Sequence, residues 1–132
     1  MDTTIAVIAR SARRWVIAAC VAMLAAAGAW AQDFPTKPIR LIVPTPPGSG
    51  PDVDARQMAA RLGPLLGQSV VVENRPGASA RIAIEMVAKS APDGYTLLVG
   101  TPSLATGPSL YANLPYDVKR DLVPVSLVSV TS

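Results

Sequence analysis

The chain has 132 residues, with 12 lysine and arginine residues against 9 acidic residues, one cysteine and no histidine. The lack of histidine excludes imidazole-based catalytic triads and histidine metal sites, so we assign no catalytic residue and no metal ligand. Four charged residues, Arg10, Arg13, Arg14 and Asp2, lie in an N-terminal segment that we expect to be cleaved off, as described below. Without them, nine basic and eight acidic residues remain. This nearly neutral balance indicates no nucleic-acid partner.

Residues 1–31 have the three parts of a secretory signal peptide. Three arginines precede the apolar stretch Trp15–Gly28, and Ala29-Trp30-Ala31 supplies a cleavage site of small residues. We therefore expect cleavage after Ala31, export, and a mature segment 32–132 without cysteine and thus without a disulfide. Two alternatives stay open: an uncleaved membrane anchor over residues 15–31, and a lipoprotein cleavage box that ends at Cys20.

Segments of strand type alternate with segments of helical type along residues 32–132. Short β-branched runs bounded by proline or glycine predict strands, and apolar residues spaced by three and four predict helices. The expected elements are a strand at 39–43, a helix from Asp52 to between Gly63 and Gly67, a strand at 69–73, a helix at 79–90, a strand at 95–99 and a short helix at 104–111. This βαβαβ order predicts an α/β fold with a parallel sheet. An alternating run from Val123 predicts one more strand.

Each strand of such a sheet ends in a loop that leads to a helix, so the loops 44–51, 75–80 and 100–103 should share one rim. Backbone N–H groups and helix dipoles converge there, which favours an anionic ligand. In the first loop, Gly48 and Gly50 allow close approach to the main chain, while four prolines restrict it. The alternative is that these glycines and prolines are ordinary turn residues.

Four segments also resemble a known family in order and spacing: "FPTKPIRLIVPTPPGSGPDVDARQMA", "LGQSVVVENRPGAS", "KSAPDGYTLLVGT" and "SLYANLPYDVKRDLVPVSLVS". They are similar to the periplasmic solute-binding receptors of tripartite tricarboxylate transporters, the Bug-type proteins. The resemblance implies a two-lobed fold of the type II periplasmic-binding-protein kind, with residues 32–132 as part of the first lobe. It also implies a non-enzymatic receptor, without a cofactor, that passes a small carboxylate to integral membrane permease subunits.

The same resemblance assigns ligand-binding residues to each loop. In the first loop, main-chain amides of Pro47-Gly48-Ser49-Gly50 would surround a carboxylate, although proline offers no N–H group. Asp52 would contact the ligand or, alternatively, serve as a helix N-cap. Ser79 and Ala80 stand where the family has two glycines, and Arg81 adds a cation at a helix start that the dipole disfavours. Thr101 and Ser103 would contribute hydroxyl groups from the third loop.

Other classes of protein fit the sequence poorly. A nucleophilic Ser49 lies in Gly-Ser-Gly rather than Gly-x-Ser-x-Gly and has no histidine as base, and the loop lacks the Gly-Lys-Ser/Thr ending of a phosphate-binding loop. The sequence stops at Ser132 inside the alternating run, so we expect a chain truncated before the second lobe. An exposed strand edge there would favour self-association. The alternative function is a remnant that binds no ligand.

Overall fold

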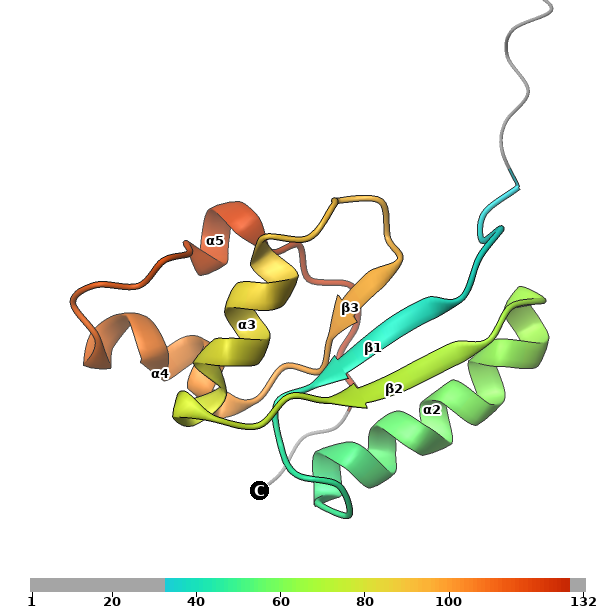
Figure 1. Ribbon diagram of the computed structural model, residues 1–132, viewed down its shortest axis with the longest axis horizontal. Coiled ribbons are helices and arrows are strands. Elements are labelled where there is room, and N and C mark those ends of the chain that lie inside the picture. The colour runs from blue at the N-terminus through green and yellow to red at the C-terminus, as the bar shows by residue number, and fades with distance from the viewer. Residues whose placement is uncertain (1–32, 129–132) are drawn as a thin grey trace, which may run out of the picture. The chain divides into compact units, whose positions relative to one another are not determined.

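The computed structural model describes residues 33–128. The elements within this range are β1 (Ile39–Val43), α2 (Gly50–Leu66), β2 (Val70–Asn74), the 3₁₀ turn η1 (Ala78–Ala80), α3 (Arg81–Ala88), β3 (Thr96–Leu98), α4 (Pro102–Leu110) and α5 (Val118–Asp121). The three strands form one parallel sheet in the order β2-β1-β3 (Figure 1). The predicted parallel α/β sheet is therefore confirmed.

The central strand β1 holds the sheet together because it is hydrogen-bonded on both edges. Its register pairs Val43 with Asn74 on β2 and Ile42 with Leu98 on β3. Ile42 and Val43 are fully buried, as expected for a strand covered on both faces. The register brings the carboxyl ends of the three strands to the same edge of the sheet, and this edge carries the loops of interest.

Helices cover both faces of the sheet (Figure 1). On one face Leu41 and Val43 pack against Ala55 of α2, and on the other Ile42 packs against Ala83 and Val87 of α3. A third cluster joins Ala80, Ile84 and Tyr116 and continues toward α4 and α5. Side chains that alternate along β1 thus contribute to the core on both faces of the sheet, as the pleat of a β-strand requires.

For the predicted elements that form, the boundaries lie within two residues of those observed, and one difference is informative. The strand predicted at 39–43 has these bounds in the structure, and the other two strands differ by one or two residues. Helix α2 ends at Leu66 because Gly67 adopts a left-handed conformation with φ 66°, the usual helix stop. The helix predicted from Ser79 begins only at Arg81, because the residues before it adopt left-handed backbone angles.

The strand predicted from Val123 does not form within the described residues. Residues 122–128 have no regular secondary structure, and Val123, Val125 and Leu127 are 85%, 81% and 77% exposed. Alternation favours a strand only where a neighbour can accept the hydrogen bonds and pack the side chains, and Pro124 has no N–H group to donate. The expected exposed strand edge is therefore wrong for residues 123–128.

The predicted signal peptide and its cleavage site lie outside the described residues. Within residues 33–128, no helix combines the length and the hydropathy that crossing a membrane would require.

Candidate functional site

Three strand-to-helix loops, residues 44–49, 75–80 and 99–101, gather at the carboxyl-end edge of the sheet (Figure 1). Backbone hydrogen bonds fix their starts: the Arg75 amide donates to the Val43 carbonyl at 2.8 Å, and the Val99 amide donates to the Ile42 carbonyl at 2.9 Å. All nine predicted ligand-binding residues belong to these loops or to the first turn of the helix that follows. We refer to this group of loops as the rim.

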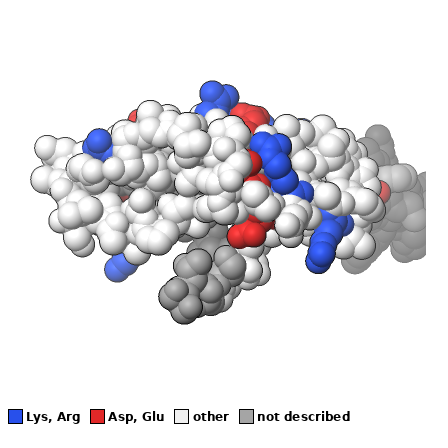
Figure 2. Space-filling view, turned by 90° about the horizontal axis from the view of Figure 1, so that it is seen from below, with Lys and Arg blue, Asp and Glu red and all other residues white. Residues whose placement is uncertain are grey.

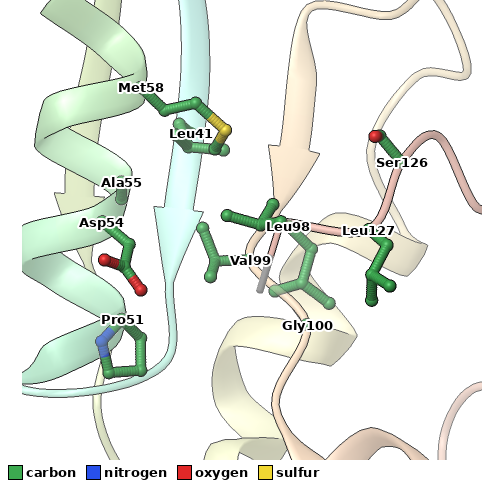
Figure 3. A pocket seen from close by; sticks show the side chains of 11 residues that line it. Leu41, Pro51, Asp54, Ala55, Met58, Leu98, Val99, Gly100, Ser126 and Leu127 are labelled. Carbon is green, nitrogen blue, oxygen red and sulfur yellow. The ribbon is translucent and has the colours of Figure 1, made fainter. Parts of the chain in front are cut away.

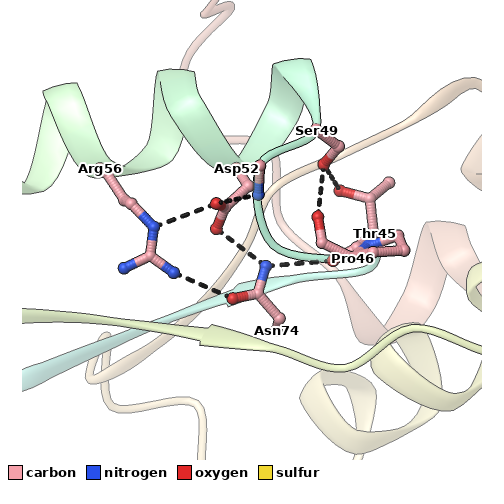
Figure 4. Close-up of polar contacts among 7 residues, drawn as sticks. Thr45, Pro46, Ser49, Asp52, Arg56 and Asn74 are labelled. Atoms are coloured by element: carbon pink, nitrogen blue, oxygen red, sulfur yellow. Dashed lines mark hydrogen bonds and ion pairs between the residues drawn. The ribbon is translucent and has the colours of Figure 1, made fainter.

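The first loop is held by hydrogen bonds of its own (Figure 4). The Ser49 hydroxyl donates to the Pro46 carbonyl at 2.7 Å and lies 2.6 Å from the Thr45 hydroxyl. Because a serine hydroxyl has a single proton, Thr45 must donate to Ser49. The Ser49 side chain, predicted as a ligand contact, is thus already engaged inside the loop.

Asp52 is almost completely buried, with 2% of its surface exposed, and both carboxylate oxygens are occupied. Its Oδ2 accepts from Arg56 Nε at 3.0 Å and from the Gly48 amide at 2.8 Å, and its Oδ1 accepts from Asn74 Nδ2 at 2.8 Å. The Arg56 guanidinium, followed by the Gly48 amide and Asn74, lowers the pKa of Asp52 from 3.8 to about 2. The carboxylate therefore stays charged and acts inside the fold.

The prediction that Asp52 could be the N-cap residue of the helix is wrong. Ser49 is the N-cap residue, and Asp52 lies in the first turn of α2. Instead of accepting from amides further along the helix, Asp52 reaches back to the amide of Gly48. Gly48 has φ +83°, a conformation that glycine adopts without strain, and this angle shapes the turn that Asp52 holds.

Asn74 and Arg56 are parts of this network that the sequence argument missed. The Asn74 amide group donates to the Thr45 carbonyl at 3.0 Å as well as to Asp52, and its Oδ1 accepts from Arg56 Nη2 at 3.1 Å. One side chain at the end of β2 thus fixes the first loop. Arg56 could have been found from its i,i+4 spacing to Asp52, whereas the role of Asn74 depends on the register of β2 beside β1.

The second loop contains three consecutive residues other than glycine with positive φ. Ala78, Ser79 and Ala80 have φ values of 47°, 55° and 72°. A Cβ atom makes this left-handed region unfavourable by about 1–2 kcal/mol per residue, so the loop stores strain. Ala80 is also buried, which leaves its methyl group in the core and not at the surface where a ligand would contact it.

Arg81 and Tyr111 brace the strained turn. Arg81 Nε donates to the Ala78 carbonyl at 3.0 Å, and its guanidinium carbon lies 4.0 Å from the centre of the Tyr111 ring. The Tyr111 hydroxyl donates to the Ser79 hydroxyl at 3.4 Å. Arg81, at the start of α3, therefore has two favourable contacts that offset its unfavourable interaction with the helix dipole. The contact with Tyr111 could not be predicted from the sequence, because the two residues are 30 positions apart.

In the third loop, Thr101 is the N-cap residue of α4 without a side-chain hydrogen bond to the helix, and Ser103 lies in its first turn. Both residues are half-buried. Within residues 33–128 no hydrogen bond involves either hydroxyl group. These two predicted hydroxyls are therefore available to a ligand.

Few backbone donors remain in the first loop. Its three prolines carry no N–H group, the Gly48 amide donates to Asp52, and the Ser49 amide donates to the Pro46 carbonyl at 3.3 Å. The amides of Thr45 and Gly50 have no acceptor within residues 33–128. Gly50 is exposed at the start of α2, where the helix dipole favours an anion.

The charged side chains beside the rim are mostly paired. Arg75 Nη2 contacts Glu73 at 3.3 Å, and Arg40 holds the same carboxylate through bonds of 2.7 and 3.0 Å. The Arg40 contact, more than burial, sets the pKa of Glu73, which is lowered to about 2. Figure 2 shows basic and acidic side chains next to one another near the middle of one face, with single basic side chains elsewhere on it and no large patch of one sign.

A cavity of about 250 Å³ borders the rim, since its lining includes Pro51 and Gly100, which are chain neighbours of predicted contacts (Figure 3). Apolar side chains make up most of its lining, between α2 on one side and β3 with residues 126–128 on the other: Leu41, Pro51, Asp54, Ala55, Met58, Leu98, Val99, Gly100, Ser126, Leu127 and Val128. None of the nine predicted ligand-binding residues lines it. The predicted contacts therefore lie on the rim surface beside this cavity and do not line it.

Solved structures with the same arrangement are periplasmic binding proteins. The structure resembles that of the periplasmic binding protein BugD, with a TM-score of 0.61 and 40% sequence identity over 64% of this chain and 28% of that one. It also resembles MatC from Rhodopseudomonas palustris with bound malate, with a TM-score of 0.62 and 33% identity over 72% of this chain and 33% of that one. The fold and the rim thus define part of a solute-binding protein.

The sequence relationship gives the family. Residues 54–132 match the tripartite tricarboxylate transporter family receptor, and the chain is 53% identical to protein BugT of Bordetella pertussis over 100 residues, which cover 74% of this chain and 31% of that protein. The chain belongs to the tripartite tricarboxylate transporter receptor family. It spans about a third of the length of the curated relatives it matches.

Proposed function

We propose that this chain supplies one wall of a periplasmic receptor site for a small carboxylate, and that the receptor delivers its ligand to the membrane permease of a tripartite transporter. The observation that carries the proposal is the convergence of three strand-to-helix loops at one edge of a parallel sheet, where open α/β folds bind ligands. The predicted signal peptide, cleaved after Ala31, would export the protein to the periplasm.

The donors that remain uncommitted at the rim support an anionic ligand. The Gly50 amide and the hydroxyls of Thr101 and Ser103 have no hydrogen-bond partner within residues 33–128. Neutral donors aimed from helix starts stabilise a carboxylate without a full counter-charge. The malate bound to MatC is a ligand of this class. The function is binding and delivery, and we propose no catalytic role for Ser49.

The hydrogen bonds inside the first loop refine which predicted residues would touch the ligand. Asp52 and the Gly48 amide bind one another, so we assign them to holding the loop in shape. The Gly50 amide, Thr101 and Ser103 are assigned to the ligand itself. A rigid loop of this kind loses little conformational freedom when a ligand binds.

Isothermal titration calorimetry of the purified protein with malate, succinate and citrate tests this proposal, and the neutral compound succinamide serves as the ligand control. Gly50→Pro removes one amide donor at the first position of a helix, where proline is well tolerated. The preceding Ser49, with φ −72° and ψ 161°, already has the extended conformation that a following proline requires.

The matched control is Gly50→Ala, which adds a Cβ but keeps the N–H group. No atom lies within 4 Å of a Cβ built at Gly50, so Gly50→Ala should fold, and circular dichroism of both variants checks that Gly50→Pro keeps the same fold. We expect Gly50→Pro to weaken carboxylate binding about tenfold or more relative to Gly50→Ala. Equal affinities for the two variants would refute the role of this amide, and failure of every carboxylate to bind would refute the proposed function.

A further inference from the structure

Arg81 differs from the other arginines beside the rim because no carboxylate pairs with it. Arg56 is bound to Asp52 at 3.0 Å and Arg75 to Glu73 at 3.3 Å. Among residues 33–128, Arg81 takes part in no ion pair, and the nearby Glu85 binds Lys89 instead. The positive charge of Arg81 is therefore uncompensated at the point where the second loop meets α3.

The Arg81 side chain is held in place although its charge is not neutralised. Its Nε atom donates to the Ala78 carbonyl at 3.0 Å, and its guanidinium stacks on Tyr111 at 4.0 Å. No hydrogen bond within the described residues uses the two terminal Nη atoms. These atoms form the fork that binds a carboxylate through two parallel hydrogen bonds, and a fixed fork loses less freedom on binding than a mobile one.

Hydroxyl-bearing side chains lie near this guanidinium, beginning with Tyr111, whose ring stacks on it. The Tyr111 hydroxyl, at the end of α4, donates to the Ser79 hydroxyl in the second loop at 3.4 Å. Tyr116, with 6% of its surface exposed, has a hydroxyl that makes no hydrogen bond within the described residues. Burial raises the pKa of Tyr116, which the charge of Arg81 opposes only in part, so this hydroxyl remains protonated. Among the described residues no buried side-chain oxygen lacks a partner, so the unbonded Tyr116 hydroxyl is open to solvent and can accept a partner from a ligand.

We propose that Arg81, positioned by Tyr111, selects the charge of the ligand, because its guanidinium binds a second carboxylate and the neighbouring hydroxyls support that contact. The inference rests on the proposed function, since it assumes that a carboxylate occupies the rim. It extends that function to a preference for dicarboxylates over monocarboxylates of the same carbon length. A small residue or an uncharged polar residue in place of Arg81 would not bind the second carboxylate of the ligand in this way.

Calorimetry with two ligand pairs of equal carbon length, succinate with butyrate and adipate with hexanoate, measures this preference. The wild-type protein should bind the dicarboxylate of at least one pair more tightly. Arg81→Gln should weaken dicarboxylate binding about 10- to 100-fold and leave monocarboxylate binding within twofold. Arg81→Lys should keep part of the preference, because it retains the charge but loses the fork.

Arg75→Gln is the control, because Arg75 is a nearby arginine, at the start of the second loop, that already contacts a carboxylate, Glu73. It should leave the preference unchanged. Two results for Arg81→Gln would overturn the inference while the proposed function stands. One is an equal loss of affinity for the dicarboxylate and the monocarboxylate of a pair, and the other is an unchanged preference for the dicarboxylate. If no compound of either pair binds the wild-type protein, the proposed function and this inference fail together.

Discussion

Replacing Ser79 by glycine should stabilise the protein, although serine-to-glycine changes usually have the opposite effect. Ser79 has φ 55° and ψ 49°, where a Cβ atom makes the conformation unfavourable by about 1–2 kcal/mol. Glycine removes that strain but adds about 0.4–1 kcal/mol of conformational freedom to the unfolded chain. The exposed hydroxyl contact to Tyr111 at 3.4 Å is weak and its loss is small.

The net gain in the free energy of unfolding should be about 0.5–1 kcal/mol. For a domain of this size such a gain corresponds to an increase in Tm of about 2–8 °C. The adjacent Ala80→Gly should have almost no net effect, because its methyl group is 7% exposed and loss of one buried methyl group costs about 0.8 kcal/mol. Two neighbouring residues with similar backbone angles should therefore respond differently.

Thermal and urea unfolding followed by circular dichroism measure these effects. Ala60→Gly is the control, since Ala60 is exposed within α2 and glycine there should destabilise the protein by about 1 kcal/mol. If Ser79→Gly lowers stability as much as Ala60→Gly does, the left-handed conformation of the second loop is not strained, and the reasoning fails.

Three further predictions concern the first loop and the N-terminal segment. Asn74→Ala removes two donated hydrogen bonds and one accepted one, so the free energy of unfolding should fall by about 1–3 kcal/mol in urea titrations. The control Gln57→Ala, on the exposed side of α2, should change it by less than about 0.5 kcal/mol. Equal losses of stability in the two variants would contradict the role of Asn74 in the network. Because the folded-state pKa of Asp52 is lowered from 3.8 to about 2, its stabilising contribution is complete above the ordinary pKa and is lost as the pH falls through the folded value. Asp52→Asn should therefore make stability less dependent on pH between 4 and 2, and an unchanged slope in unfolding experiments would argue against it. N-terminal sequencing of exported protein should begin at Gln32, and a product that begins at Met1 or at a lipidated Cys20 would refute the cleavage site.

The sheet was predictable because its signals are local. An apolar run between two prolines identifies β1, and Gly67 ends α2 where the helical periodicity stops. Parallel order then follows from the alternation of strands and helices, and with it the gathering of three loops at one rim. These steps require no knowledge of which side chains meet across the fold.

The missed features depend on partners distant in sequence. Ser79 looked helical because helical periodicity follows it, but its left-handed turn is braced by Arg81, whose guanidinium stacks on the distant Tyr111. Val123 looked like part of a strand because strand patterning is visible in the sequence, whereas a pairing neighbour is not. The engagement of the Gly48 amide by Asp52 could not be inferred from the glycine-rich motif, which indicates an open backbone whether or not another residue already uses it.

The hydrogen bonds of Asn74 make the shape of the first loop depend on the correct pairing of β2 with β1. A slip of one residue between β2 and β1 would turn every side chain of β2 to the opposite face. Asn74 would then leave the Thr45 carbonyl and the Asp52 carboxylate without their donor. The loop can therefore reach its final shape only after β2, which is synthesised later, has docked in register, so a mispaired chain would not present an intact rim to ligand.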